Sequence, residues 1–301
     1  MKLSIIVPVY NSEKTISILV EETVRSLDKK INFEIILVND CSKDNSWKAM
    51  KDVQVLYAPL VTIINLKENT GENNAVMAGF NFARGAYLVH MDDDLQNPPL
   101  EILKLLSEIE KGYDVVYSYY SQKKHSHIRN IGSRLHNMIA YLCLKKPKNL
   151  YLSTFRIITR NLKNEICKYK GAYTYIDALV LLATTRIGTV QVNHSERAES
   201  RSNYTYLKLM QITLNMIFSH YTFLLKFFLL ITVALISSIT FLLYTSLLMK
   251  TRTFVIHFLI FSILFFFILT ILAIIWEYRK RSVLHEGMRK QYEIKEIIKS
   301  S

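Results

Sequence analysis

The stretch Ala86-Tyr-Leu-Val-His-Met-Asp-Asp-Asp-Leu-Gln-Asn-Pro-Pro99 joins a short apolar strand to a loop that holds three consecutive carboxylates. Adjacent carboxylates repel and raise one another's pKa unless a cation lies between them. Mg²⁺ and Mn²⁺ prefer oxygen ligands, and Mg²⁺ often joins one or two carboxylates to substrate phosphates. Aspartate is also common at helix starts, and a helical pattern begins at Leu100. By itself, the stretch is therefore compatible with a metal site and with an acidic helix cap.

Strand-like and helical patterns alternate along the first 120 residues. Helical periodicity occurs at 13–27, 44–56, 72–84 and 100–111. Short apolar runs typical of buried strands occur at 3–9, 33–38, 61–66, 86–92 and 114–118, and two more at 152–159 and 188–194. Because strands and helices alternate with short connections, the sequence predicts an α/β fold with a parallel sheet that is covered by helices on both faces.

Polar residues follow four of the predicted strands, at Tyr10, Asp40, Gly71 and Asp92–Asp94. Ligands of such sheets bind beyond the carboxyl ends of the strands, so these loops should converge on one edge. This convergence favours the metal interpretation of the acidic stretch. No Gly-x-Gly-x-x-Gly follows the first strand and no Gly-Lys-Ser/Thr loop occurs, so neither a dinucleotide cofactor nor a Walker-type phosphate site is indicated.

The second half of the chain contains two long apolar segments. The 23 residues Phe227–Met249 carry no charge, and the 24 residues Thr253–Trp276 carry one histidine and no charge. Each is long enough to cross a hydrocarbon core of roughly 30 Å, although a buried core helix is the alternative for either. Their short connector predicts a two-helix transmembrane hairpin. Basic residues follow the second segment in excess over those in the connector, which places the tail and the N-terminal domain in the cytoplasm.

The predicted organisation has four parts. Residues 1–204 are predicted to form a cytoplasmic domain, 205–222 an amphipathic juxtamembrane helix, 223–278 two transmembrane helices at about 227–249 and 253–276, and 279–301 a basic cytoplasmic tail. The net charge of +13 is compatible with nucleic acid, anionic lipid or phosphorylated substrates. Since much of the basic excess lies beside the apolar segments, anionic lipid explains it and no nucleic-acid partner is expected. The three cysteines are far apart and predict reduced thiols.

Four motifs occur at the strand ends in a fixed order. They are Ile6-Val-Pro-Val-Tyr-Asn11, Val38-Asn-Asp-Cys-Ser-Lys-Asp44, Asn69-Thr-Gly71 with Ala78-Gly79, and Met91-Asp-Asp-Asp-Leu-Gln-Asn-Pro-Pro99. Together they resemble family 2 glycosyltransferases of the GT-A fold, in the branch that acts on polyprenyl phosphates. The resemblance covers about residues 1–220, and the two-helix tail is similar in layout to bacterial members. It implies a mostly parallel GT-A sheet with flanking helices, followed by the transmembrane hairpin.

The resemblance also implies an activity and a location. It indicates an inverting transferase that moves a sugar from a nucleotide-sugar donor, with a UDP-sugar favoured, to undecaprenyl phosphate for cell-envelope glycan synthesis. The enzyme would lie in the bacterial cytoplasmic membrane as a multi-pass protein, with its catalytic domain and both termini in the cytoplasm. Its cofactor would be Mg²⁺ or Mn²⁺. A homo-oligomer is an option that the sequence leaves open.

Donor-site residues follow from the resemblance position by position. Asp92 and Asp94 match the Asp-x-Asp motif, which holds the donor diphosphate through the divalent ion and so neutralises charge on the leaving group. Gln96 is implied close to the metal or the acceptor phosphate, and completes the catalytic set with Asp92 and Asp94. Residues implied to contact the nucleotide sugar are Pro8, Tyr10, Glu13, Asp40 (toward the base), Gly71 and Asp92.

Acceptor-site residues are implied further along the chain. The segment 194–204 resembles the loop that closes over the active site in this family. A guanidinium can bond a phosphate through two parallel N–H groups, which suits arginine to that role. The implied acceptor-phosphate residues are Arg197, Arg201, Ser202 and Tyr204, with Arg129 and Ser133 as a looser match.

The sequence departs from the family pattern within the acidic motif. The middle residue is Asp93, to which no role is assigned, and Asn97 stands where an acid is usual. Asp177 is interpreted as structural, because a phosphate acceptor is already ionised and needs no strong general base. Two alternatives remain open: transfer to a hydroxyl of a lipid-linked glycan or surface polysaccharide, and a non-catalytic membrane scaffold.

Overall fold

The computed structural model describes residues 2–120, 150–172, 174–193 and 290–299, together with Pro147, Ser195 and scattered residues between 237 and 275. The chain divides into two compact units, Met1–Leu209 with Arg289–Ser301 and Met210–Met288. Nearly all described residues belong to the first unit, and the elements below are those of that unit.

Strands and helices alternate through the first unit as the sequence pattern predicts. The strands are β1 (Leu3–Val9), β2 (Phe33–Asn39), β3 (Val61–Leu66), β4 (Tyr87–His90), β5 (Val115–Tyr119), β6 (Arg156–Thr159), β7 (Ile187–Gln191) and β8 (Ile294–Ile298). The helices are α1 (Ile16–Leu27), α2 (Ser46–Leu56), α3 (Glu72–Phe82), the 3₁₀ turn η1 (Pro99–Glu101), α4 (Ile102–Ile109), α6 (Arg160–Ile166) and α7 (Ile176–Ala183).

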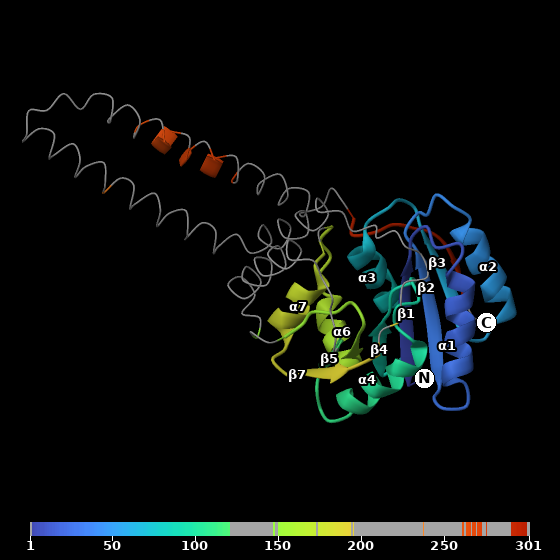
Figure 1. Cartoon of the computed structure of the whole chain (residues 1–301). Coiled ribbons are helices and arrows are strands. Elements are labelled where there is room, and N and C mark those ends of the chain that lie inside the picture. Colours follow the sequence, from blue (N-terminus) through green and yellow to red (C-terminus); the bar gives the residue numbers. More distant parts are fainter. Residues whose placement is uncertain are drawn as a thin grey trace, which may run out of the picture. The chain divides into compact units, whose positions relative to one another are not determined.

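These strands form one sheet in the order β7-β5-β6-β4-β1-β2-β3-β8 (Figure 1). The central pairs β1–β2, β1–β4 and β2–β3 are parallel, as is β5–β7. Strand β6 is antiparallel to both of its neighbours, and β8 is antiparallel to β3. The sheet is therefore mostly parallel, and the purely parallel sheet derived from the alternation alone is corrected by these two strands.

Helices cover both faces of the sheet, and this confirms the predicted layering. One apolar core contains buried residues of α1, α2 and α4, and the other contains those of α3, α6 and α7. Every residue of β1, β2 and β3 is buried. This agrees with their continuous apolar runs, since a strand covered on both faces has no polar side. Helix α3 lies close to the sheet at Gly79, where an added Cβ would lie 2.5 Å from Ile6 Cγ2.

Several helices and strands begin or end a few residues away from their predicted boundaries. Helix α1 starts at Ile16 and not at 13, since the Ser12 carbonyl accepts the N–H groups of Thr15 and Ile16 in a turn. Strand β4 ends at His90 and not at 92, so all three acidic residues lie in the loop. The predicted strands 152–159 and 188–194 shorten to β6 and β7. No element was predicted for α6 or α7.

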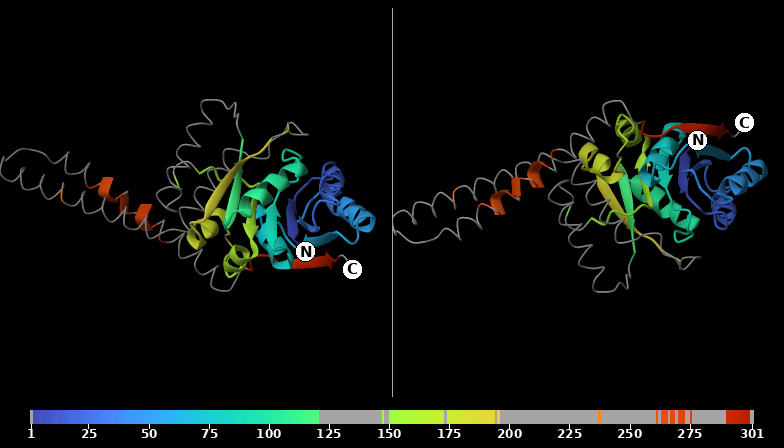
Figure 2. Two further views of the ribbon diagram at one scale, coloured as in Figure 1. Left: turned by 90° about the horizontal axis from the view of Figure 1, so that it is seen from below. Right: turned by 90° about the horizontal axis from the view of Figure 1, so that it is seen from above.

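The end of the chain returns to the sheet. Strand β8 pairs with the edge of β3, and the backbone N–H of Lys67 donates to the carbonyl of Glu293 at 2.8 Å (Figure 2). The predicted catalytic domain, residues 1–204, is therefore incomplete, since part of the predicted tail 279–301 supplies the last strand of its sheet. Local pattern misses this strand because Ile294, Ile297 and Ile298 have helical spacing. Pairing along an otherwise open strand edge decides its conformation.

Within the part of the chain that the structure describes, no helix combines the length and the apolar character that a membrane span requires. The predicted spans 227–249 and 253–276 lie almost entirely outside the described residues, as does the predicted juxtamembrane helix 205–222.

Candidate active site

Four loops meet at the carboxyl edge of the central strands: 10–15 after β1, 40–45 after β2, 67–71 after β3 and 91–98 after β4. Each contains one residue in the left-handed backbone region, namely Asn11 (φ 56°), Cys41 (φ 57°), Gly71 (φ 88°) and Leu95 (φ 62°). A positive φ is uncommon for residues other than glycine, and an apolar branched residue such as Leu95 adopts it rarely. Parallel pairing of β1, β2, β3 and β4 brings all four predicted loops to one edge, and each loop turns there through one such residue.

The loops after β1 and β2 are joined by reciprocal hydrogen bonds. The Glu13 carboxylate accepts from the N–H of Asn45 at 2.9 Å, and the Asp44 carboxylate accepts from the N–H of Glu13 at 3.1 Å. Asn11 adds a second link, because its side-chain oxygen accepts from the N–H of Lys43 at 2.8 Å. Glu13, predicted to contact the nucleotide, is thus engaged in holding two loops together. Tyr10 is 39% exposed beside it.

The Asp40 carboxylate organises the loop that precedes α3. Its two oxygens accept from the backbone N–H of Thr70 at 2.7 Å and from that of Gly71 at 2.8 Å. The Thr70 hydroxyl donates to the same carboxylate at 3.1 Å. The side chain is buried, and hydrogen bonding to the charged form compensates for that burial. Asp40 and Gly71 are therefore brought together as predicted, in a contact that fixes the loop.

Pro8 is the penultimate residue of β1 and not part of the loop that follows it. It is buried within β1, where its Cα is paired with that of Val38. Its position differs from those of Tyr10 and Glu13, which lie in the loop itself.

Asp93, for which the sequence suggests no role, joins the acidic loop to the loop after β1. Its Oδ2 accepts from the backbone N–H of Tyr10 at 3.2 Å and from the hydroxyl of Ser12. Burial raises the pKa of Asp93 to about 6, and the hydrogen bonds from Ser12 and Tyr10 oppose that rise. Asp93 thus bonds the loop after β1, whereas Asp92 bonds Thr154.

Asp92 lies on the other side of the acidic loop. Its Oδ2 accepts from the Thr154 hydroxyl at 2.6 Å. Burial raises the pKa of Asp92 well above its usual value, and the neighbouring carboxylate of Glu72 raises it further. Asp93 and Asp94 act in the same direction. A divalent cation would relieve this repulsion, so the charge of the site suits one.

Asp94 and Gln96 shape the end of the acidic loop. The Asp94 carboxylate accepts from the backbone N–H of Gln96 at 3.2 Å. The Gln96 carbonyl accepts from the N–H of Ser195 at 2.9 Å, which ties the beginning of the predicted closing loop to the acidic loop. Asn97, the departure from the family pattern, is buried and accepts from the Tyr120 hydroxyl at 2.7 Å.

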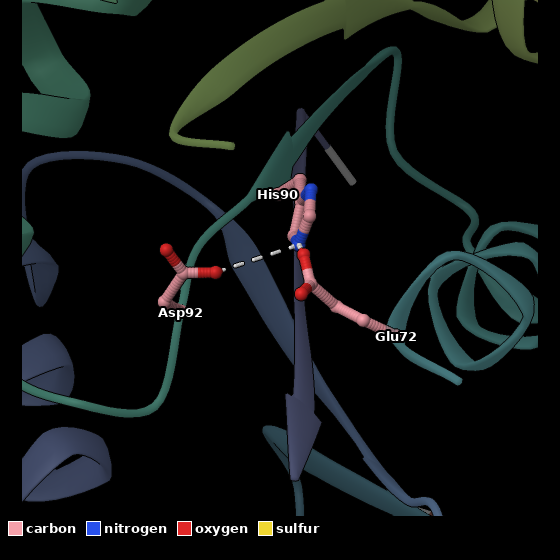
Figure 3. A group of neighbouring side chains, drawn as sticks. All are labelled: Glu72, His90 and Asp92. Atoms are coloured by element: carbon pink, nitrogen blue, oxygen red, sulfur yellow. Dashed lines mark ion pairs between the residues drawn. The ribbon is translucent and has the colours of Figure 1, made fainter. Parts of the chain in front are cut away.

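Glu72 and His90 join Asp92 in a cluster that sequence reasoning missed. Figure 3 shows one ring nitrogen of His90 facing the carboxylates of both Glu72 and Asp92. His90 Nε2 lies 3.9 Å from Glu72 Oε1 and 3.9 Å from Asp92 Oδ1. Sequence reasoning missed them because Glu72, the first residue of α3, has the position of an ordinary acid at a helix start, and His90 is the last residue of a strand. The carboxylate oxygens of the acidic loop and of Glu72 fit a hard divalent cation.

A buried ion pair between Arg156 and Asp177 contacts this cluster through His90. Arg156 is 2% exposed, and its Nη1 donates to Asp177, which also accepts from the Tyr117 hydroxyl at 2.9 Å. The other guanidinium end faces His90, with Arg156 Nη2 at 3.4 Å from Nδ1. These contacts agree with the structural interpretation of Asp177. The predicted acceptor residues Arg129, Ser133, Arg197, Arg201, Ser202 and Tyr204 lie outside the described residues.

A mostly parallel α/β sheet with an acidic loop at its carboxyl edge defines a GT-A-like domain. Residues 4–172 match the family model described as glycosyl transferase family 2, and the chain belongs to that family. Family membership thus confirms the resemblance that the four motifs carry.

Several relatives are similar over most of the chain. Undecaprenyl-phosphate 4-deoxy-4-formamido-L-arabinose transferase of Proteus mirabilis is 33% identical over 70% of this chain and 65% of its own length. The corresponding proteins of Yersinia enterocolitica and Serratia proteamaculans are 33% and 32% identical, over 72% of this chain and 66% and 67% of their own lengths. The chain thus spans about two thirds of the length of these relatives.

Solved structures share the fold. Glucosyl-3-phosphoglycerate synthase from Mycobacterium tuberculosis with bound UDP superposes with a TM-score of 0.55 at 15% identity, covering 74% of this chain and 79% of that chain. The same enzyme with Mn²⁺, UDP and phosphoglyceric acid gives 0.56 at 16% identity, covering 74% and 78%. At this identity the likeness establishes the GT-A-like fold and nothing finer.

Proposed function

We propose that this chain transfers a sugar from a nucleotide-sugar donor to a membrane polyprenyl phosphate, with inversion at the anomeric carbon. One observation carries the proposal: relatives that are about a third identical over some 70% of the chain are undecaprenyl-phosphate sugar transferases. The acidic loop at the ligand edge of the sheet supplies the matching chemistry. The product would serve cell-envelope glycan synthesis.

The donor, with a UDP-sugar favoured, binds across the edge formed by the four loops. Asp40 and the loops that it holds face the nucleotide, with Pro8, Tyr10, Glu13 and Gly71. Asp92 and Asp94 hold the diphosphate end through Mg²⁺ or Mn²⁺. When bound, the cation neutralises the charge that grows on the leaving diphosphate. The solved Mycobacterium tuberculosis enzyme of the same fold was obtained with Mn²⁺ and UDP-glucose, which supports this cofactor and donor class.

The acceptor phosphate approaches Gln96 and the closing loop. One phosphate oxygen attacks the anomeric carbon, the bond from that carbon to the diphosphate oxygen breaks, and the electron pair leaves with the nucleoside diphosphate. The acceptor is already ionised near neutral pH, so no side chain needs to remove a proton. Arg197 and Arg201, with Ser202, Tyr204, Arg129 and Ser133, are proposed to bind the phosphate. The contact between Gln96 and Ser195 supports this by joining the start of that loop to the acidic loop.

A membrane location follows from the lipid acceptor. We propose that residues 227–249 and 253–276 span the bacterial cytoplasmic membrane, with the catalytic unit and both termini in the cytoplasm. Helical residues Phe261, Ile263 and Phe265 in the second segment are 68%, 60% and 56% exposed, as lipid-facing residues would be. The pairing of β8 with β3 agrees with two spans and not with one, because a chain that returns to its own sheet crosses a membrane an even number of times.

The proposal is tested by mass spectrometry of lipid products. Purified full-length protein is incubated with undecaprenyl phosphate and a panel of UDP- and GDP-sugars, including UDP-4-deoxy-4-formamido-L-arabinose, with Mn²⁺, with Mg²⁺ or with EDTA. We expect one lipid-phosphate sugar, formed only with a divalent cation. Transfer to a lipid-linked glycan but to no polyprenyl phosphate would establish the hydroxyl-acceptor alternative instead.

Two aspartate variants separate an enzyme from a scaffold. Asp94→Ala removes a proposed ligand of the cation and should abolish turnover, whereas Asp52→Ala removes an exposed carboxylate on α2 and should leave it unchanged. A protein that supports its cellular role equally well with Asp94→Ala would be a scaffold.

A further inference from the structure

The two ring nitrogens of His90 face opposite charges. The side chain is 1% exposed at the last position of β4. Nδ1 faces the guanidinium of Arg156 at 3.4 Å, while Nε2 faces the carboxylates of Glu72 and Asp92 at 3.9 Å each. Nε2 has no hydrogen-bond partner among the described residues. A buried polar atom without a partner is costly unless something binds near it.

Arg156 determines which nitrogen carries the proton. A guanidinium has only donors, so the Nδ1 that faces it must accept, and the proton of the neutral ring then lies on Nε2. Asp177 and the pairing of β6 hold Arg156 in place. Moving the ring proton to Nδ1 would therefore be costly, because it would place two N–H donors against each other.

The Nε2–H group therefore points at the carboxylates. A histidine that ligates a metal through Nε2 needs a lone pair there, so His90 is excluded as a direct ligand in this tautomer. Distances of 3.9 Å are longer than hydrogen bonds, and the interaction is one of a buried N–H dipole with two negative charges. One carboxylate oxygen of Glu72, one of Asp92 and the ring nitrogen of His90 all lie within 4.8 Å of one another. At this distance, the N–H dipole lowers the repulsion between the two carboxylates.

Glu72 comes to this cluster from a different element. It stands in the first turn of α3, where the helix dipole favours a negative charge, and its side chain is 32% exposed. We propose that Glu72 is a third carboxylate of the cation site, and that His90 is a positioning residue whose Nε2–H faces the carboxylates of both Glu72 and Asp92. The inference rests on the proposed function only for its premise that the acidic loop binds a divalent cation.

The test measures Mn²⁺ binding directly. Full-length protein in detergent is titrated with Mn²⁺, and free Mn²⁺ is followed by electron paramagnetic resonance with and without UDP. Removing residues that orient metal ligands typically costs 10–100-fold in affinity. We expect Glu72→Gln to raise the Kd for Mn²⁺ by roughly 10-fold or more. Glu21→Gln, the same change at an exposed position of α1, should leave the Kd unchanged.

A pair of histidine variants tests the positioning role. The amide of Gln can place an N–H near the position of Nε2, whereas the shorter Asn cannot. His90→Asn should therefore weaken Mn²⁺ binding by roughly 10-fold, and His90→Gln should restore much of it. Thermal unfolding of each variant identifies a loss of fold, and the partly exposed Glu72→Gln keeps the test valid if both histidine variants unfold.

Nitrogen-15 resonance of labelled histidine provides a readout that does not depend on activity. We expect the signal lost in His90→Asn to have a protonated Nε2 and an unprotonated Nδ1, with and without Mg²⁺, which is diamagnetic and does not broaden the signal. An unprotonated Nε2 that binds Mg²⁺ would overturn the positioning role. An unchanged Kd in Glu72→Gln would overturn the role of Glu72, while sugar transfer by the wild type would still stand. Conversely, a weakened Kd in an enzyme that transfers no sugar would refute only the proposed function.

Discussion

Asp93→Asn should stabilise the protein near neutral pH. Burial raises the folded-state pKa of Asp93 from 3.8 to about 6. A raised carboxyl pKa means that the unfolded chain loses its proton first, so stability falls as pH rises from about 4 to 6 and stays lower above it. Asparagine has no charge to bury, and its Oδ1 can accept from both Tyr10 N–H and the Ser12 hydroxyl, as Asp93 Oδ2 does now.

The size of the effect follows from the pKa shift. The shift is about 2 units, and each unit corresponds to about 1.4 kcal/mol, so the ionised side chain costs up to about 3 kcal/mol above pH 7. Partial exposure of Asp93 reduces this, and we expect a gain of about 1–3 kcal/mol for Asp93→Asn. For a unit of this size, that gain corresponds to a rise in Tm of roughly 3–10 °C.

The measurement is thermal unfolding of metal-free protein in EDTA between pH 4 and 8, at one scan rate. The difference in Tm between Asp93→Asn and wild type should be small at pH 4, grow to about pH 7 and then level off. Asp52→Asn on the exposed face of α2 is the control and should show no such growth. A variant that is less stable than wild type at pH 7.5 would show that the bonds to ionised Asp93 outweigh its burial, contrary to this reasoning.

Three further predictions concern packing and the sheet edge. Asp177→Asn leaves the buried Arg156 without an ionised partner and should cost about 3–5 kcal/mol, seen as a lower Tm, whereas combining it with Arg156→Met should recover most of that loss. Gly85→Ala should cost about 1–3 kcal/mol, since the new Cβ would lie 2.5 Å from the backbone nitrogen of Ser4; an unchanged Tm would show that the strand shifts freely. Deleting residues 291–301 should lower Tm and promote aggregation on size-exclusion chromatography, because the edge of β3 loses β8, whereas deleting 300–301 alone should do neither.

The sequence by itself determined the alternation of strands and helices, the convergence of four polar loops and the acidic motif at the end of β4. These features depend on residues that are close together in the chain: apolar runs define buried strands, and short connections define where each strand ends. The family was therefore identified correctly from its motifs, Met91–Pro99 among them. The roles of Asp92 and Asp94 stay predictions.

Only the tertiary structure decided which distant side chains meet. From the sequence, Glu72 has the position of a helix-start acid and His90 that of a strand residue. The two meet because β4 pairs with β1, the strand on which α3 packs. Asp93 acquires a role because Tyr10 and Ser12, more than 80 positions away, donate to it. Strand β8 has helical spacing in sequence and becomes a strand because β3 offers an unpaired edge. In each case, the contact depends on packing across the sheet, which local patterns of hydrophobicity and charge do not encode.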